Sequence, residues 1–204
     1  MTRRADCSPG RSCADAGAVT ARCLGLFLCV WASACTGFRS VRPDVFRSPQ
    51  PGEDQLARRI AQHDIKTVVC LRGDGDPTAA SARAAQGAGI EFWNVPMSAT
   101  RLPRPETLLE LWRVADRAPR PLLVHCRAGV DRTGLCCAIV VLHDTGNLAA
   151  ARQQLALVPN GHLGMFGTQA MGEVLDRYEP HCDRLSFPDW VREVYAADYA
   201  ALHR

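Results

Sequence analysis

The sequence lacks the features that would indicate a membrane-spanning, nucleic-acid-binding or metal-binding protein. No apolar run approaches the roughly 20 residues that a transmembrane helix needs. The net charge is +3, and residues 1–34 contribute +2 of it, so no basic surface for nucleic acid is indicated. The cysteines beyond residue 35 lack metal-site spacing, and repeats and low-complexity tracts are missing. What is present, 47% hydrophobic and 22% charged residues over 204 positions, indicates one globular domain.

The first 34 residues have the pattern of an export signal. A basic stretch leads into an apolar run at residues 23–34, which ends in the small residues Ala-Ser-Ala directly before Cys35. Small residues before a cysteine resemble the bacterial lipoprotein box, in which the cysteine is lipidated after cleavage, and two acyl chains suffice for stable anchoring. We therefore predict a signal peptide at 1–34, lipidation of Cys35 and attachment to a bacterial membrane in the cell envelope. The alternatives are a soluble periplasmic protein, a cytoplasmic protein, and a buried first helix.

Beyond the signal, the chain alternates between strand and helix patterns. Residues 36–52 are rich in Pro, Gly and Ser and predict a linker, 35–45, that continues as a loop into a domain at 46–204. Short apolar, β-branched runs predict strands, and apolar residues at helical spacing predict helices. The strands are expected at 65–71, 90–97 and 121–125, and the helices at 53–64, 77–89, 103–118, 133–143, 149–157, 167–178 and 187–202. This alternation predicts an α/β fold with a central, mostly parallel sheet of about four or five strands flanked by helices.

The stretch "LLVHCRAGVDRTG", residues 122–134, places a thiol, a carboxylate and a guanidinium in one turn between a buried strand and a buried helix. The strand delivers Cys126 to the carboxyl edge of the sheet, where open α/β proteins bind ligands. Backbone N–H groups of the following loop and of the helix N-terminus form a cradle for an anion. A thiol in such a field ionises more readily, so Cys126 is predicted to be a nucleophile. The phosphate-binding loop residues are Arg127, Ala128, Gly129, Val130, Asp131 and Arg132.

Four neighbours of Cys126 have predicted roles. Arg132 can grip a tetrahedral oxyanion with two N–H donors. Gly129 permits a close backbone approach. Thr133 offers a hydroxyl group to the sulfur, and His125 orients the loop by hydrogen bonding. The stretch therefore predicts a nucleophile in a phosphate-binding site.

His125-Cys126 followed by Arg132-Thr133-Gly134 resembles the H-C-x5-R-[ST] signature of cysteine-dependent protein tyrosine and dual-specificity phosphatases. The segments "FRSPQP" (46–51), "IKTVVCLRGDGD" (65–76) and "WNVPMSATRLPRPE" (93–106) are similar, in order and spacing, to bacterial dual-specificity-like tyrosine phosphatases. The resemblance implies a dual-specificity phosphatase fold and a two-step reaction through a phosphocysteine, with no metal and no organic cofactor. It also implies that the partner is a phosphorylated protein or a small phosphomonoester.

The general acid departs from the family's common pattern. Those phosphatases usually take it from an Asp on a loop some thirty residues before the cysteine, but that region here has no carboxylate before Glu106. Asp131 is the preferred substitute, because an Asp directly before the signature arginine recurs in phosphoinositide-directed members. Its alternative role is to cap the following helix. Asp74, Asp76 and Glu106 are the other candidates.

The substrate is left open by the sequence. Arg47, Arg72 and Asp74 lie in predicted loops near the site and are candidate substrate contacts. Phosphotyrosine is the leading substrate. A phosphoinositide or inositol phosphate is the alternative within the enzyme class, and a phosphate-binding pseudophosphatase is the alternative outside it.

Overall fold

The computed structural model describes residues 37–156, 160–161 and 169–204. The predicted signal peptide and Cys35 therefore lie outside the described residues. Within those residues, no helix is both long enough and apolar enough to cross a membrane.

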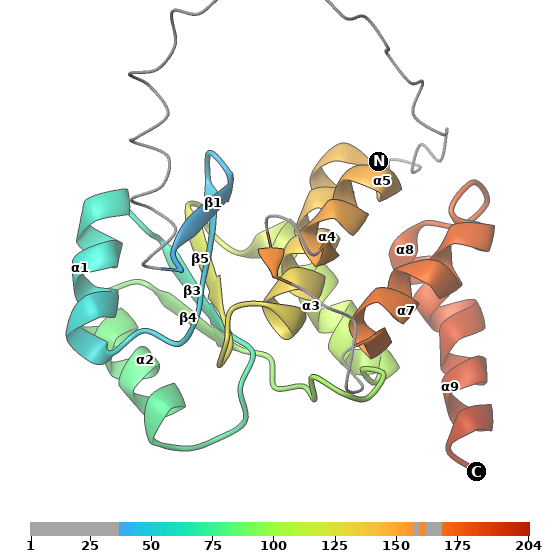
Figure 1. Ribbon diagram of the computed structural model, residues 1–204, viewed down its shortest axis with the longest axis horizontal. Coiled ribbons are helices and arrows are strands. Elements are labelled where there is room, and N and C mark those ends of the chain that lie inside the picture. Colours follow the sequence, from blue (N-terminus) through green and yellow to red (C-terminus); the bar gives the residue numbers. More distant parts are fainter. Residues whose placement is uncertain (1–36, 157–159, 162–168) are drawn as a thin grey trace, which may run out of the picture.

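A five-stranded sheet forms the centre of the domain (Figure 1). Its spatial order is β1-β2-β5-β3-β4; β1 runs antiparallel to β2, and the other pairs are parallel. The predicted mostly parallel sheet is thus confirmed, and the parallel strands all end at one edge. The strands are β1 (Arg39–Arg42), β2 (Val45–Ser48), β3 (Thr67–Cys70), β4 (Glu91–Asn94) and β5 (Leu122–His125).

The strands β1 and β2 lie in the stretch expected to be linker and loop, so that prediction was wrong there. Each strand has only four residues, which is too short for a clear alternation. The β2 strand is specified by its partner: Val45 pairs with Leu122 and Ser48 with His125 of β5, more than 70 residues away. Such pairing is invisible to a local pattern.

Helices cover both faces of the sheet (Figure 1). On one face, α1 and α2 pack with Leu123 and Val68 in a small core. On the other face, Leu122 and Val124 join the larger core of the remaining helices. The alternation along β5 therefore assigns its residues to two separate cores. The helices are α1 (Glu53–His63), α2 (Asp76–Gly87), α3 (Pro105–Arg117), α4 (Asp131–Thr145), α5 (Leu148–Arg152), α7 (Gln169–Tyr178), α8 (Phe187–Trp190) and α9 (Ala196–Leu202).

The central helix α4 is the element that follows the predicted nucleophile. All residues from 133 to 142 are buried, as expected of a pattern that is apolar all round. Its C-terminus has Gly146 in the left-handed conformation, with φ of 67°. The helix thus supports the loop at its N-terminus from inside the core.

Short irregular turns interrupt the helices predicted after α4. The helix expected at 149–157 is α5 followed by a 3-10 turn, η1 (Gln153–Leu155). The helix expected at 187–202 is α8 and α9 joined by a π-helical turn, η3 (Val191–Tyr195), and another 3-10 turn, η2 (Glu179–His181), follows α7. The first residues of the helix expected at 167–178 lie outside the described residues.

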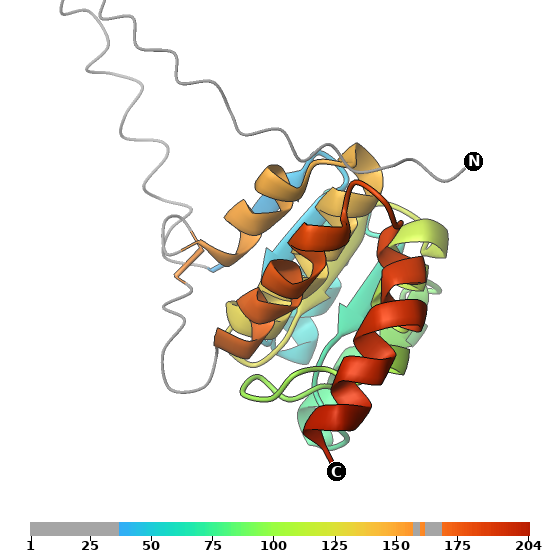
Figure 2. The same cartoon turned by 90° about the vertical axis from the view of Figure 1, so that its right-hand side faces the viewer.

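The C-terminal helices form an outer layer, in which Figure 2 shows α7 and α9 facing the viewer. The hydroxyl group of Tyr195 donates a hydrogen bond to the carbonyl oxygen of Pro103 over 2.7 Å. This bond ties the C-terminal layer to the loop between β4 and α3. That loop follows the carboxyl end of a parallel strand, so the C-terminal layer borders the edge where Cys126 lies.

Candidate active site

Cys126 directly follows β5 at the carboxyl edge of the sheet, and only 2% of it is exposed. The backbone N–H of Gly129 donates a hydrogen bond to its Sγ over 3.2 Å. A loop amide therefore points inward, toward the sulfur, as an anion cradle requires.

Gly129 is required by its surroundings. Its φ is 71°, and a Cβ atom there would lie 2.4–2.6 Å from backbone atoms of Ser48 and Pro49. The predicted close approach is therefore an approach of the end of β2 to the loop. No other residue fits this position without moving backbone.

Arg47 was expected to contact substrate, and the structure corrects this. Its side chain is 1% exposed. Nη2 donates to the carbonyl oxygens of Gly129 and Val130, both at 3.0 Å, and Nη1 donates to that of Gln154 at 3.1 Å. Arg47 thus binds the carbonyl oxygens of the loop, while the amide of Gly129 donates to the sulfur of Cys126. It is a positioning residue with no surface to offer a substrate.

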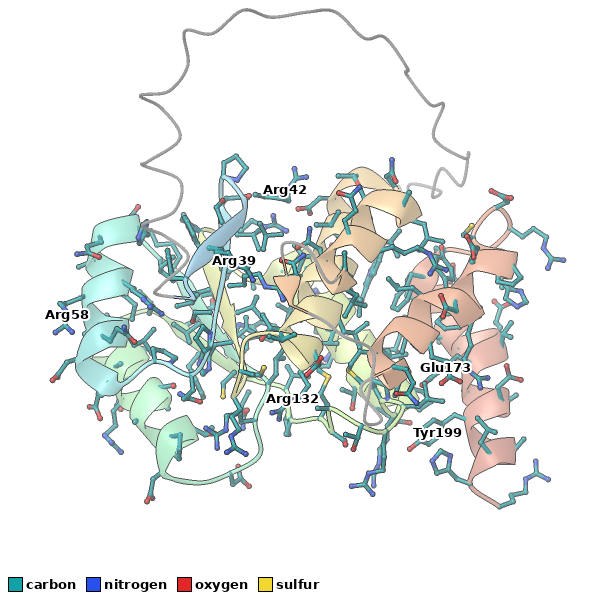
Figure 3. All side chains as sticks on the ribbon, in the orientation of Figure 1. Arg39, Arg42, Arg58, Arg132, Glu173 and Tyr199 are labelled. Carbon is teal, nitrogen blue, oxygen red and sulfur yellow. The ribbon has the colours of Figure 1, made fainter. Side chains whose placement is uncertain are left out.

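Arg132 lies across the same sheet edge (Figure 3). Its Nη1 donates to the carbonyl oxygens of Leu71, at 3.3 Å, and Met97, at 3.4 Å, in the loops that follow β3 and β4. Both bonds are long for N–H···O contacts. A phosphate oxygen is a stronger acceptor than a carbonyl oxygen, so a bound phosphate can replace them.

His125 is completely buried beneath the loop. Burial lowers its pKa to about 4; the nearby backbone of Cys126 opposes this shift, and the charge of Arg72 adds to it. The imidazole is therefore neutral at pH 7. Neither ring nitrogen has a hydrogen-bond partner among the described residues, so the predicted role of orienting the loop by hydrogen bonding stays a prediction.

Thr133 does not make the predicted contact with sulfur. Its side chain is buried, and its hydroxyl group has no hydrogen-bond partner among the described residues. The structure therefore places this hydroxyl in the first turn of α4 without bringing it to Cys126.

Asp131 is the first residue of α4, and it is half-buried. Val130 occupies the N-cap position, and its side chain forms no cap hydrogen bond, so Asp131 lies one residue further on, in the first turn of the helix. The alternative capping role of Asp131 stays a prediction. The other acid candidates reach the same edge: Asp74 in the loop after β3, Asp76 at the start of α2, and Glu106 in the first turn of α3. The role of Asp131 as general acid stays a prediction.

Gln50 is a site residue that the sequence reasoning missed. Its backbone N–H donates to the carbonyl oxygen of Arg127 at 3.1 Å. Its side-chain Nε2 donates to Ser81 Oγ at 3.0 Å, while Oε1 accepts from Arg72 Nη1 at 3.3 Å. Gln50 thus connects the loop, α2 and Arg72. Its position within the segment "FRSPQP", which carries the family resemblance, was the one available signal.

The other thiols near the site differ from Cys126 in their surroundings. Burial raises the pKa of Cys137 to about 11, and it also raises that of Cys136. Both stay protonated at neutral pH, while Cys126 has an amide donor at its sulfur. Cys182 is disulfide-bonded. Within the described residues, no group of three or more His, Cys, Asp or Glu side chains could hold a metal ion.

Comparisons with known proteins agree with this geometry. Residues 44–146, about half of the chain, match the family Tc-R-P, described as "Polymorphic toxin system, DSP-PTPase phosphatase". No curated protein matches the chain. The fold is similar to that of Tk-PTP in its active form, with 21% identity, 69% of this chain and 97% of that chain covered, and a TM-score of 0.52.

Two structures of TpbA from P. aeruginosa are also similar. The first has 23% identity, covers 72% of this chain and 91% of that chain, and has a TM-score of 0.55. The second is a variant in complex with pTyr. It has 22% identity to this chain and a TM-score of 0.50, and the match covers 81% of this chain and 93% of that chain. At these identities the likeness shows the fold alone.

Proposed function

The chain belongs to the DSP-PTPase phosphatase family of polymorphic toxin systems and is a cysteine-based phosphatase; from that premise we propose that it hydrolyses phosphotyrosine in protein substrates. The contact that carries the proposal is the hydrogen bond from the Gly129 amide to Cys126 Sγ. It aims a loop donor at the sulfur. The pTyr complex of a TpbA variant supports the choice of phosphotyrosine.

In the proposed first step, the thiolate of Cys126 attacks phosphorus, and the bond from phosphorus to the tyrosine oxygen breaks. The loop amides and the guanidinium of Arg132 hold the three nonbridging oxygens, where charge is greatest in the transition state. Asp131, protonated at this stage, gives its proton to the leaving oxygen. The products of the step are free tyrosine hydroxyl and a phosphocysteine.

In the second step, water attacks the phosphocysteine and releases phosphate and the thiolate. Asp131, now a carboxylate, accepts the proton of that water. No metal or organic cofactor takes part in the proposed reaction. Neutral His125 keeps its place beneath the loop throughout both steps.

The test is turnover of para-nitrophenyl phosphate and phosphotyrosyl peptides in the presence of a chelator. Cys126→Ser should abolish turnover while phosphate still binds, because a serine hydroxyl is hardly ionised in the same cradle. Arg132→Lys should also fail, because an ammonium group cannot supply two planar donors. Cys137→Ser, a change at a neighbouring buried thiol, is the control. Near-parental activity of Cys126→Ser would contradict the proposal.

Export is part of the proposed function. The apolar run at 23–34 and the small residues before Cys35 support cleavage and lipidation of that cysteine. The mature protein would then act at the cell envelope. Intact-mass spectrometry of the membrane fraction should find a chain that begins at diacylated Cys35. A mature chain that keeps residues 1–30 would contradict cleavage, and an unmodified Cys35 would contradict anchoring.

A further inference from the structure

Several arginines that form no ion pair among the described residues lie together at the carboxyl edge of the sheet; Arg58, on α1, forms none either. Away from this edge, ion pairs with carboxylates engage Arg42, Arg83, Arg113, Arg117, Arg120, Arg152, Arg177 and Arg192. Five arginines at the edge form no ion pair with any residue that the structure describes: Arg72, Arg101, Arg104, Arg127 and Arg132. Arg132 is assigned to the scissile phosphate. The other four are cations that the phosphate does not account for.

The carboxylates of this edge do not neutralise these arginines. Glu110 pairs with Arg113, and the charge of Asp76 acts on Arg83. The other carboxylates at this edge are those of Asp74, Glu106 and Asp131, of which Asp131 has an interaction of its own, against five guanidinium groups. The edge therefore keeps a positive surplus, whereas the whole chain is nearly neutral for its size, at +3.

The four remaining arginines are spread over three loops. Arg72 follows β3, Arg127 follows Cys126, and Arg101 and Arg104 lie between β4 and α3. Arg127, Arg101 and Arg104 are exposed, and Arg72 is half-buried, with Gln50 holding its Nη1. In a binding site for a compact ligand, the arginines would form one cluster. Cations along an edge suit an extended ligand that crosses the site.

A cavity of about 720 Å³ adjoins the site on one side. Arg101 and Arg104 line it, together with Glu106, Glu110, Met97 and, from α9, Tyr199. Arg132 donates to the carbonyl oxygen of Met97, so the wall of the cavity is joined to the predicted phosphate-binding arginine. Figure 3 shows Arg132 and Tyr199 toward the same lower edge of the molecule. A chain leaving the phosphate toward α9 would pass this cavity.

We propose that this edge binds acidic residues that flank the phosphorylated residue, so that the preferred substrate is an acidic phosphopeptide segment of a protein. The inference rests on the proposed function and adds the class of substrate. Arg101 and Arg104 contact carboxylates on one side of the phosphotyrosine, and Arg72 and Arg127 contact those on the other. Charge complementarity of this kind raises the rate of encounter and sets specificity.

The experiment compares two phosphotyrosyl peptides of equal length, one with Asp and Glu on both sides of the phosphotyrosine and one with Asn and Gln. The wild type should cleave the acidic peptide with a kcat/KM roughly 10-fold higher, since several exposed charge pairs act together. Raising the salt from about 50 mM to about 500 mM should reduce that ratio to about 2-fold, because exposed charges are screened. The difference in kcat/KM between the two peptides should come mainly from a lower KM for the acidic peptide.

The variants locate the effect. The double substitution Arg101→Gln with Arg104→Gln should lower the ratio to roughly 3-fold. Arg72→Gln, added to both, should lower it further. Arg58→Gln is the matched control: this exposed arginine also forms no ion pair among the described residues, but it lies on α1, away from Arg132 (Figure 3). It should keep the wild-type ratio.

Three outcomes would overturn the inference in different ways. Equal turnover of the two peptides would leave the proposed phosphotyrosine activity standing and remove only the acidic preference. Faster turnover of an inositol polyphosphate than of either peptide would assign the arginines to a small polyanion. No turnover of any peptide by an enzyme that hydrolyses para-nitrophenyl phosphate would overturn both the phosphotyrosine proposal and this one.

Discussion

Arg47 Nη2 lies 3.0 Å from the carbonyl oxygen of Gly129, and this hydrogen bond joins the interior of β2 to the loop that follows Cys126. The strand and the loop meet at a second point, because the Gly129 backbone also packs against Ser48, the last residue of β2, and Pro49. The guanidinium forms no ion pair among the described residues, and its hydrogen-bond acceptors are the carbonyl oxygens of Gly129 and Val130 in the loop and of Gln154 in η1. A side chain of β2 therefore positions the predicted phosphate-binding loop.

Replacing Arg47 should damage both stability and turnover. In Arg47→Met, three buried or half-buried carbonyl oxygens lose their donor, and we expect the free energy of unfolding to fall by about 3 kcal/mol. The kcat for para-nitrophenyl phosphate should fall at least roughly 10-fold, because the loop loses the hydrogen bonds that position Gly129 and Val130. Arg47→Lys keeps the charge and should be intermediate. Urea unfolding and steady-state kinetics measure the two effects, and Arg58→Gln is the surface control. A methionine variant with wild-type kcat would show that the loop holds its shape alone.

Gly129→Ala should be far more harmful than the same change at Gly89. The two glycines have similar positive φ values, 71° and 65°, so the backbone strain of an alanine, about 1 kcal/mol, is common to both. At Gly89 nothing lies within 4 Å of the new Cβ, whereas at Gly129 it would overlap backbone. We expect Gly129→Ala to cost at least about 2 kcal/mol more and to lower kcat strongly. Equal losses of unfolding free energy would contradict the tight approach of β2.

His125 should make the protein less stable in mild acid. Its pKa falls from the ordinary 6.5 to about 4 on folding, so between these values the unfolded chain binds a proton that the folded protein does not. The free energy of unfolding therefore drops as the pH falls from about 6.5 to about 4, by ~3 kcal/mol for this group. In His125→Gln the contribution is absent, so its unfolding free energy should vary less with pH. Urea titrations at pH 7.5 and 4.5 measure this difference; equal drops in both proteins would refute it.

The parts of the fold and site that could be predicted are those encoded in neighbouring residues. An apolar strand, a loop with Cys126 and Arg132, and a helix that is apolar all round follow one another, so the sequence predicted the loop and its anion-binding geometry. The parallel sheet followed from the alternation of patterns. These features need no knowledge of which distant segments meet.

The parts that failed depend on long-range pairing. Arg47 was placed in a loop, because the four residues of β2 show no pattern until β5 pairs with them. Gln50 contacts Arg127 and Ser81, which lie far from it in the chain, and neither contact has a local signal. The length of the helix expected at 149–157 was misjudged, because α5 ends at Arg152 and a 3-10 turn follows it. A turn and the packing around it decide where a helix ends.

Asp131 is the proposed substitute for an acid that the family resemblance would place some thirty residues before Cys126, and its substitution tests the proposed general acid. Asparagine keeps the shape of the side chain but cannot give a proton. Asp131→Asn should therefore slow hydrolysis of an alkyl phosphate by about 10²–10⁴-fold, because the poor leaving group needs the proton. It should slow para-nitrophenyl phosphate much less, because para-nitrophenolate departs unaided. The pH–rate profile for the alkyl phosphate should also lose its alkaline limb. Asp74→Asn and Glu106→Gln, at the same edge of the sheet, are the matched controls and should keep that limb. If Asp131→Asn slows both substrates equally and the limb survives, Asp131 is not the acid; a control variant that loses the limb would identify the acid instead.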